Sequence, residues 1–200
     1  MTIHRRNRAE IFGTEQNKKT RESYSMKNGN VFSAATWKGD RSLFIVQAGI
    51  IAANYVVLTV IFAPFGFGEV QVRVAEMLTI LPFFMPAAVP GLFIGCLIGN
   101  VLGGALLPDV IFGSIATLIG AVGTYLIGKA FARKAETKNL ILASLPPIVA
   151  NAVIVPFILK YAYAIPLPIP LMMLTVGAGE IASCGVLGVI LGKAFDRIEK

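Results

Sequence analysis

Residues 69–114 read EVQVRVAEMLTILPFFMPAAVPGLFIGCLIGNVLGGALLPDVIFGS and place charged, amide and hydroxyl groups inside an apolar region. Ionisable and amide side chains are costly within a membrane, so their presence there indicates a functional site. Glycines at every fourth residue from Gly91 to Gly103 predict a flat helix face against which a neighbouring helix packs closely. The stretch therefore predicts a membrane protein with a polar pocket built around it.

The composition of the whole chain agrees with membrane insertion. Of its 200 residues, 56% are hydrophobic and only 14% are charged, which excludes an ordinary soluble domain. The length from Ser42 to Ala194 fits six spans of about 20 residues each. The second span is short, and its V-x-V-x-V opening also fits a strand. We expect an all-α membrane protein with six transmembrane helices near residues 43–62, 72–85, 86–107, 110–131, 140–160 and 169–194.

The distribution of the basic residues predicts the orientation. A net charge of +7 would suit a nucleic-acid-binding protein, but 16 of the 18 Lys and Arg lie in three segments that six spans place on one side. The positive-inside rule then puts both termini in the cytoplasm of a multi-pass protein of the cell membrane, with no nucleic-acid partner. The 16 residues are Arg5, Arg6, Arg8, Lys18, Lys19, Arg21, Lys27, Lys38, Arg41, Lys129, Arg133, Lys134, Lys138, Lys193, Arg197 and Lys200.

The chain divides into a tail, a membrane domain and a short end. Residues 1–42 are polar and basic, and they lack the apolar segment of a signal peptide. We expect a disordered cytoplasmic tail, with attraction to a lipid surface as the functional alternative. Residues 43–195 form the predicted transmembrane domain, and residues 196–200 form a cytoplasmic carboxyl end.

Several classes of chemistry are excluded or disfavoured. His4 lies in the tail, so no histidine is available for a metal or acid–base site in the membrane. Cys96 and Cys184 are far apart and form no redox motif, so we interpret them as small packing residues. The segment GTYLIGK, residues 123–129, matches the start of a phosphate-binding loop but lies inside an apolar helix and lacks the following Ser or Thr. We expect no ATPase, no enzyme activity, no metal and no cofactor in this chain.

The first group of candidate site residues opens the second span. Glu69, Arg73 and Glu76 are spaced to line one stripe of a helix. An exposed ladder of ion pairs at the membrane surface would explain Glu69 well. Glu76 lies two turns deeper, which favours a role in a pocket.

The remaining candidates are distributed over four further spans. Asn100 lies beside the glycine ridge, and Asp109 opens the fourth span, where it suits both the helix dipole and ligand contact. Asn151 follows two prolines, so it can satisfy backbone carbonyls or reach a ligand. Glu180 lies about eleven residues into the sixth span, near the bilayer midplane. With Ser114, these side chains predict a pocket for a small, flat solute that is nitrogen-rich or cationic.

Several segments together resemble one family of membrane proteins. They are QVRVAEMLTILPFF, GLFIGCLIGN, the DVIFGSIATLIGA run and the GAGE of the sixth span. The chain resembles the QueT family over roughly residues 43–195. Members of this family are substrate-binding S components of energy-coupling factor (ECF) transporters, associated with queuosine precursors.

The resemblance implies a compact six-helix bundle that binds a 7-deazaguanine precursor of queuosine, or a related base. It implies that Glu76 or Glu180 faces the guanine-like N–H groups, and that Asp109 neutralises an aminomethyl group. The implied partners are an ECF transmembrane coupling subunit and two ATPase subunits, which would use ATP. S components commonly dock through an AxxxA face of the first helix, and Ala48 and Ala52 match that pattern.

Three alternatives remain open. A free-standing proton-coupled carrier would use Glu76 and Glu180 as a relay, although the chain is short and shows no inverted pair of broken helices. An S component for a different vitamin-like compound would share the fold. A packing subunit without transport would need only the glycine ridges, and the midplane Glu180 argues against it.

Overall fold

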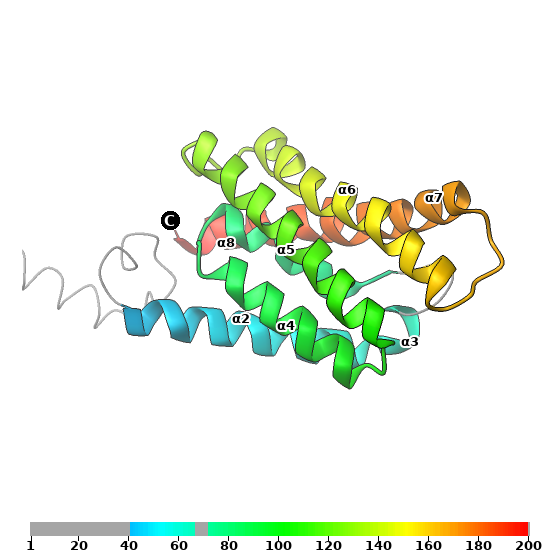
Figure 1. Cartoon of the computed structure of the whole chain (residues 1–200). Coiled ribbons are helices and arrows are strands. Elements are labelled where there is room, and N and C mark those ends of the chain that lie inside the picture. Colours follow the sequence, from blue (N-terminus) through cyan, green and yellow to red (C-terminus); the bar gives the residue numbers. More distant parts are fainter. Residues whose placement is uncertain (1–40, 67–71, 200) are drawn as a thin grey trace, which may run out of the picture.

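The computed structural model describes residues 41–66 and 72–199 as a bundle of helices (Figure 1). Residues 1–40 of the predicted tail, Glu69 and Lys200 lie outside the described residues. The described part contains no strand, which confirms the all-α prediction there. Its elements are α2 (Arg41–Ile61), α3 (Ala63–Gly66), the 3-10 helix η2 (Val74–Phe83), α4 (Ala88–Leu102), α5 (Leu107–Ala130), α6 (Thr137–Tyr161), α7 (Ile169–Glu180), the π-helix η3 (Ile181–Leu187) and α8 (Gly188–Glu199).

Each predicted span coincides with a helical segment, but within residues 41–66 and 72–199 only four segments are long and apolar enough to cross a membrane alone. These four are α2, α5, α6 and the continuous α7–η3–α8 segment. The second and third spans are shorter than predicted, because η2 has 10 residues and α4 has 15. At the usual rise per residue they extend only about 20 Å each, against a hydrocarbon core of roughly 30 Å. Pro82, Pro86 and Pro90 explain the difference, since they restrict a continuous α-helix across this region.

The 3-10 helix η2 occupies the centre of the bundle. It contacts α2, α4, α5, α6, η3 and α8, and eight of its ten residues are buried. Its sequence, VAEMLTILPF, is apolar around the whole helix except at Glu76 and Thr79, which is the composition of a helix enclosed by others. Leu78 and Leu81 pack in a core cluster with α2 and α4, whereas Ile80 and Phe83 pack in a second cluster with α6.

The glycine ridge of α4 packs against α2, as the four-residue spacing predicts. A Cβ atom on Gly91 would lie 2.7 Å from the carbonyl oxygen of Ala48, and one on Gly95 would lie 3.0 Å from Cα of Ala52. A Cβ atom on Gly99 would lie 3.1 Å from Oγ1 of Thr59. The absence of side chains on the ridge therefore lets the two backbones approach closely.

The α5–α6 contact is formed by glycines against prolines. A Cβ atom on Gly120 would lie 2.6 Å from Cα of Pro147, and one on Gly123 would lie 2.5 Å from Cβ of Pro146. Gly128 packs against the carbonyl group of Phe83 in η2. The GxxxxGK match therefore lies within one continuous helix, and both of its glycines serve helix packing.

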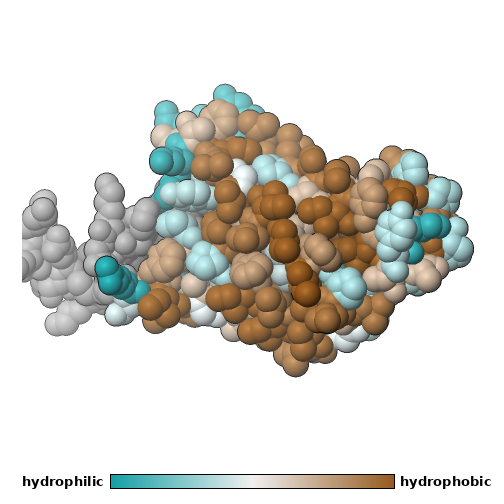
Figure 2. Space-filling view, viewed as in Figure 1, coloured by the Kyte–Doolittle hydropathy of each residue, from teal (hydrophilic) through white to brown (hydrophobic). Residues whose placement is uncertain are grey.

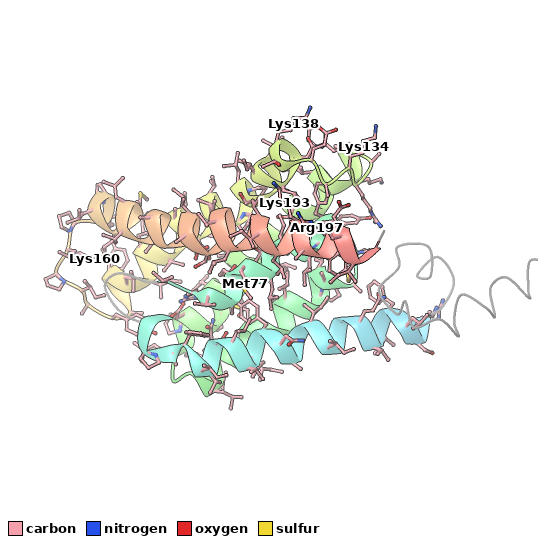
Figure 3. All side chains as sticks on the ribbon, turned by 180° about the vertical axis from the view of Figure 1, so that it is seen from behind. Met77, Lys134, Lys138, Lys160, Lys193 and Arg197 are labelled. Carbon is pink, nitrogen blue, oxygen red and sulfur yellow. The ribbon has the colours of Figure 1, made fainter. Side chains whose placement is uncertain are left out.

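The outer surface of the bundle is apolar, and its charges collect at the ends. The visible face is largely hydrophobic around its middle (Figure 2). Lys134, Lys138, Lys193 and Arg197 lie at one end of the bundle, and Lys160 lies at the other (Figure 3). The beginning of α2 and the end of α8 both lie at the basic end (Figure 1). This arrangement agrees with the grouping of basic segments from which the orientation is predicted.

Candidate functional site

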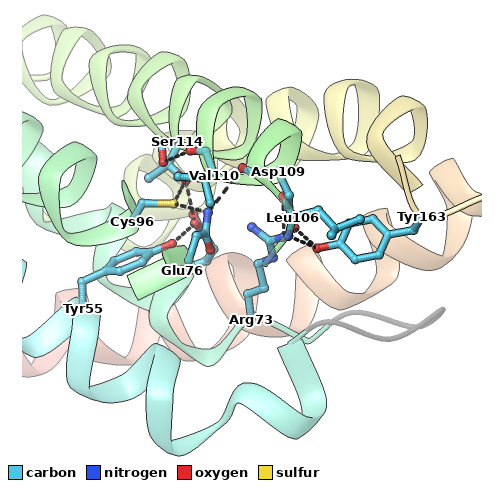
Figure 4. A network of polar contacts seen from close by, with 11 residues as sticks. Tyr55, Arg73, Glu76, Cys96, Leu106, Asp109, Val110, Ser114 and Tyr163 are labelled. Atoms are coloured by element: carbon cyan, nitrogen blue, oxygen red, sulfur yellow. Dashed lines mark hydrogen bonds and ion pairs between the residues drawn. The ribbon is translucent and has the colours of Figure 1, made fainter. Parts of the chain in front are cut away.

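A cluster of polar side chains is enclosed in the bundle around the first turns of η2 (Figure 4). It receives side chains from α2, α4, α5 and the α6–α7 loop, and α6, α7 and η3 add more beside it. The seven predicted substrate-binding residues are all at most 7% exposed. They are Arg73, Glu76, Asn100, Asp109, Ser114, Asn151 and Glu180.

Glu76 is the carboxylate nearest the centre of this cluster. Its Oε1 accepts a short hydrogen bond from the hydroxyl of Tyr55 and another, of 2.8 Å, from Oγ1 of Thr117. Its Oε2 is buried and has no hydrogen-bond partner. Oε1 of Glu76 is thus hydrogen-bonded within the protein, whereas Oε2 can still accept hydrogen bonds.

Arg73 and Asp109 form a buried ion pair. Nη2 of Arg73 lies 3.0 Å from both carboxylate oxygens of Asp109. The pair depends on Gly113, one turn along α5, because a Cβ atom there would lie 2.7 Å from Oδ1 of Asp109 and 3.4 Å from both Nη1 of Arg73 and Nδ2 of Asn100. Asp109 also lies in the first turn of α5, so the helix dipole favours its charge as the sequence predicts.

Tyr163 covers the ion pair from the loop between α6 and α7. Its hydroxyl donates a hydrogen bond of 3.2 Å to Oδ2 of Asp109 and accepts one of 3.1 Å from the backbone N–H of Leu106. Partial burial raises the pKa of Tyr163, and the negative charge of Asp109 raises this pKa further. The hydroxyl therefore keeps its proton and can donate to the carboxylate.

Asn100 and Ser114 are buried beside the cluster but bind it weakly or not directly. The amide nitrogen of Asn100 lies 3.5 Å from Sγ of Cys96 and 3.5 Å from the backbone oxygen of Asp109. Ser114 donates to the carbonyl oxygen of Val110 at 2.6 Å, so its hydroxyl is satisfied within α5. Asn100 is thus placed against the ion pair, whereas the hydroxyl of Ser114 serves its own helix.

Glu180 approaches Glu76 at the junction of α7 and η3. Sγ of Cys184 donates to Oε2 of Glu180 at 3.2 Å and lies 3.4 Å from the backbone oxygen of Glu76. One donor atom from each of Glu76, Glu180 and Cys184 lies within 4.8 Å of the others, a spacing that would also surround a metal ion. The π-helix begins directly after Glu180, and such helices frequently occur at functional sites.

Asn151 extends the cluster from α6. It is fully buried, and neither polar atom of its amide has a hydrogen-bond partner of normal geometry. Its side chain nevertheless lies close enough to the Glu180 carboxyl to interact with it. The amide therefore offers an unused donor and an unused acceptor beside a carboxylate.

The predicted docking residues lie apart from this cluster. Ala48 and Ala52 are partly buried, and backbone atoms of both contact the α4 glycine ridge. This is the internal packing role that small residues at this spacing commonly have. Docking through the same residues stays a prediction.

Sequence reasoning missed several members of the cluster. Tyr55, Thr117 and Tyr163 supply hydrogen bonds to its carboxylates, and Cys96 and Cys184 make polar contacts besides packing. The sequence did contain a pattern that indicates Thr117. Asp109, Gly113 and Thr117 are spaced four residues apart and so share a face of α5. The contact of Tyr163 depends on how the α6–α7 loop returns over the bundle, which no periodicity indicates.

Two hollows flank the cluster. A narrow cavity reaches it beside the carboxyl-terminal half of α2 and is lined by Tyr55, Leu58, Thr59, Phe62, Arg73, Val74, Ala75 and Asn100. A groove of about 530 Å³ between α5 and α6 is lined by Pro108, Phe112, Val153, Ile154, Phe157, Ile158, Tyr161 and Ala162. The groove has no charged side chain. The narrow cavity has polar lining residues but a volume of only about 10 Å³, which is room for about one water molecule. A solute as large as a base would therefore require the surrounding side chains to move.

Comparison with known proteins gives the chain its relatives. The QueT transporter family model matches residues 45–197. The chain is 37% identical over 84 residues to the queuosine precursor transporter QueT of Lactococcus lactis subsp. cremoris (strain MG1363), a match that covers 41% of this chain and 49% of that protein. The chain thus spans about half the length of the curated relative it matches. No solved structure matches it significantly.

The family match covers the bundle from the first turns of α2 to α8, and with it every residue of the buried cluster. It also confirms the resemblance based on the R-x-x-E, glycine-ridge, D-x-x-x-G-S and GAGE segments, and it identifies a family of transporters rather than of enzymes. The chain belongs to the QueT transporter family.

Proposed function

We propose that this chain is the membrane-embedded substrate-capture subunit of an ECF-type transporter for a queuosine precursor. The observation that carries the proposal is the enclosed polar cluster, in which three carboxylates and two amides are collected from η2, α4, α5, α6 and α7 inside an apolar bundle. Such groups are too costly in a membrane to serve packing alone. Family membership supplies the class of solute.

The proposed solute is a 7-deazaguanine precursor, whose ring edge carries several N–H donors. Glu76 and Glu180 offer carboxylate oxygens that can accept from N–H groups of this solute, on the ring or on its substituent, and Asn151 offers both an acceptor and a donor beside them. The sequence resemblance assigns an aminomethyl group to Asp109. The carboxylate of Asp109 is already bound by Arg73 and Tyr163, which favours the Glu76–Glu180 pair for that role.

Energy for uptake would come from partner subunits. In this proposal a transmembrane coupling subunit docks on α2, and two ATPase subunits hydrolyse ATP on the cytoplasmic side. The start of α2 and the end of α8 lie on the same side of the bundle, together with most of its labelled basic residues. This supports a cytoplasmic location for both termini of a protein of the cell membrane.

Calorimetric titration tests the binding proposal. The purified full chain in detergent is titrated with the aminomethyl precursor, guanine and riboflavin in parallel. We expect tight binding of the precursor alone, and severe weakening in Glu76→Gln and Glu180→Gln variants. Glu136→Gln is the matched control, because this glutamate is 55% exposed and pairs with Lys138 at the basic end. Intact affinity in both site variants would remove them from the site.

Uptake assays separate the proposal from a proton-coupled carrier. Cells or vesicles containing the chain with its coupling module should accumulate precursor in an ATP-dependent manner, and dissipating the proton gradient at constant ATP should leave uptake unchanged. Uptake by the chain alone that collapses with the proton gradient would support the carrier instead.

A further inference from the structure

The buried cluster has an excess of negative groups. Among the described residues, the buried charged side chains are the acids Glu76, Asp109 and Glu180 and the single base Arg73. Arg73 is bound to Asp109 through both carboxylate oxygens. The donors to Glu76 and Glu180 are instead the neutral hydroxyls of two residues, Tyr55 and Thr117, and a thiol. In the described part of the chain, three buried acids thus share a single buried base, whose charge also acts on Glu180.

The same pair of carboxylates faces unused hydrogen-bonding groups. Oε2 of Glu76 is buried and has no partner, and Asn151, which is fully buried beside Glu180, has none of normal geometry for either amide atom. A buried polar atom that lacks a hydrogen-bond partner destabilises the folded state. Buried side chains without hydrogen-bond partners in an otherwise well-packed bundle indicate that a ligand supplies the missing hydrogen bonds.

We propose that the Glu76–Glu180 pair binds a positively charged group of the transported solute, namely a protonated primary amine. This inference rests on the proposed function and names which form of the solute the site selects. An ammonium group has three N–H donors, and the site offers acceptors on three residues, the carboxylates of Glu76 and Glu180 and the side-chain amide oxygen of Asn151. Donor atoms of the two glutamates lie within 4.8 Å of each other, so one nitrogen can bond to both at charge-assisted distances.

The geometry disfavours Asp109 as the main counter-ion. Its charge is already balanced by Arg73, and Tyr163 covers it, so a cation there would have to compete with a guanidinium at 3.0 Å. The charge of Arg73 also acts on Glu180, but the hydrogen bonds that the two glutamates accept come from neutral groups, the hydroxyls of Tyr55 and Thr117 and the thiol of Cys184. The two assignments make opposite predictions for charge-removing variants.

The test uses three 7-deazaguanines that share the ring and differ at one substituent. The aminomethyl compound is cationic, the hydroxymethyl compound has nearly the same shape and is neutral, and the cyano compound is neutral and linear. In calorimetric titrations of the full chain, we expect the aminomethyl compound to bind on the order of 100-fold more tightly than the hydroxymethyl compound, as for a buried charge pair. Equal affinities would overturn the inference but leave the proposed function standing. No binding of any of the three would overturn both.

Charge-removing variants show which carboxylate is responsible for the preference for the cationic compound. Glu76→Gln and Glu180→Gln should each reduce the ratio of the two affinities to about 10 or less, whereas Asp109→Asn should weaken both compounds and leave the ratio unchanged. A ratio that collapses in Asp109→Asn and persists in the two glutamate variants would overturn the assignment. If a variant fails to fold, the ratio measured on the unaltered chain still decides whether the site selects a cation.

A metal ion is the other occupant that the test must detect. Glu76, Glu180 and Cys184 supply suitable donor atoms, so elemental analysis and titration in the presence of a chelator accompany each experiment. We expect no stoichiometric metal and no effect of the chelator. One metal ion per chain that is lost in Cys184→Ser and retained in Cys96→Ser would overturn the inference and assign the pair to the metal.

Discussion

Gly113 illustrates how much of the site depends on single residues. Its missing side chain leaves the space in which Asp109, Arg73 and Asn100 approach one another. The ion pair in turn joins the segment before η2 to the start of α5, and Tyr163 adds the α6–α7 loop. One glycine therefore allows three separate parts of the chain to be connected by polar contacts.

Replacement of Gly113 by Ala should break this arrangement. The new methyl group would lie 2.7 Å from Oδ1 of Asp109, so we expect a loss of about 1–3 kcal/mol in the free energy of unfolding, together with weaker solute binding. Thermal unfolding in detergent and calorimetric titration measure the two effects. Gly49→Ala is the control, because a Cβ atom there would meet nothing within 4 Å. Equal behaviour of the two variants would contradict the packing role.

Tyr163 gives the structure a dependence on alkaline pH. Because its pKa is raised in the folded chain, its contribution to stability is fully present below the unfolded value of about 10 and is lost as the pH rises toward the folded value. We expect the midpoint of thermal unfolding to fall more steeply between about pH 9 and pH 11 in the unaltered chain than in Tyr163→Phe. Parallel curves for the two proteins would show that this hydroxyl does not contribute.

The sequence indicated which polar residues would be buried together better than it indicated their hydrogen-bond partners. Glu76, Asp109 and Glu180 could be selected because a carboxylate inside an apolar run is costly in a membrane and therefore indicates a functional role. The pairing of Arg73 with Asp109 could not be selected, since it joins residues 36 positions apart through a loop and a helix start. The hydroxyl of Tyr55 was missed for the same reason, because it belongs to the first span but donates a hydrogen bond to Glu76 in the second.

At the scale of elements, the contact between α2 and α4 positions the aromatic donor of the site. A Cβ atom on Gly95 would lie 2.8 Å from Cβ of Tyr55, so the ridge sets where Tyr55 stands relative to Glu76. The four-residue glycine spacing predicted this contact. The second span was predicted to be short, but the 3-10 form of η2 was not predicted, because Pro82 leaves several helical geometries open and burial on all sides decides among them.

Gly95→Val should therefore disturb binding as well as packing. We expect a lower unfolding temperature and an affinity for the precursor reduced by roughly tenfold, because a displaced Tyr55 no longer donates to Glu76 and one hydrogen bond to a charged group contributes about 1.5–3 kcal/mol. Gly49→Val, on the open side of α2, provides the comparison. Affinity that stays intact in a destabilised Gly95→Val protein would show that Tyr55 is dispensable for the solute.

Docking of a partner on α2 can be tested with matched alanines. Ala48→Trp and Ala52→Trp should block co-purification with the coupling module and block uptake, while the isolated chain still binds precursor. Ala53→Trp is the control, since Ala53 lies on the exposed side of the same helix. Loss of precursor binding in the Ala48 and Ala52 variants would instead assign these residues to the internal contact with α4 alone.

For the whole molecule, the distribution of charge was the most informative property of the sequence. Among the described residues, the labelled basic residues Lys134, Lys138, Lys193 and Arg197 lie at one end, as the grouping predicts, and Lys160 lies at the other. Arg73, which with Lys160 is outside the three basic segments, is buried in an ion pair. The number of full-length spans could not be obtained in the same way, because hydropathy does not reveal that two apolar segments are short and enclosed.

Labelling of introduced cysteines tests the orientation. Lys160→Cys should react with a membrane-impermeant maleimide added to intact cells, and Lys138→Cys should react only after the cells are made permeable. The native Cys96 and Cys184 are buried and should not react with the maleimide in either condition. The reverse pattern would invert the topology and place the basic end outside.

The central position of η2 links the solute to the far end of the protein. Glu76 stands in its first turn, and Phe83 at its last turn packs against α5 and α6 near the basic end, where Phe84 meets the ring of Phe195 in α8 at 5.0 Å. A tight helix of ten residues enclosed by six neighbours has little freedom to bend. If Glu76 contacts the solute as proposed, we therefore expect a displacement of its side chain to be transmitted along η2 as a rigid unit to the basic end, where the proposed partner subunits would bind.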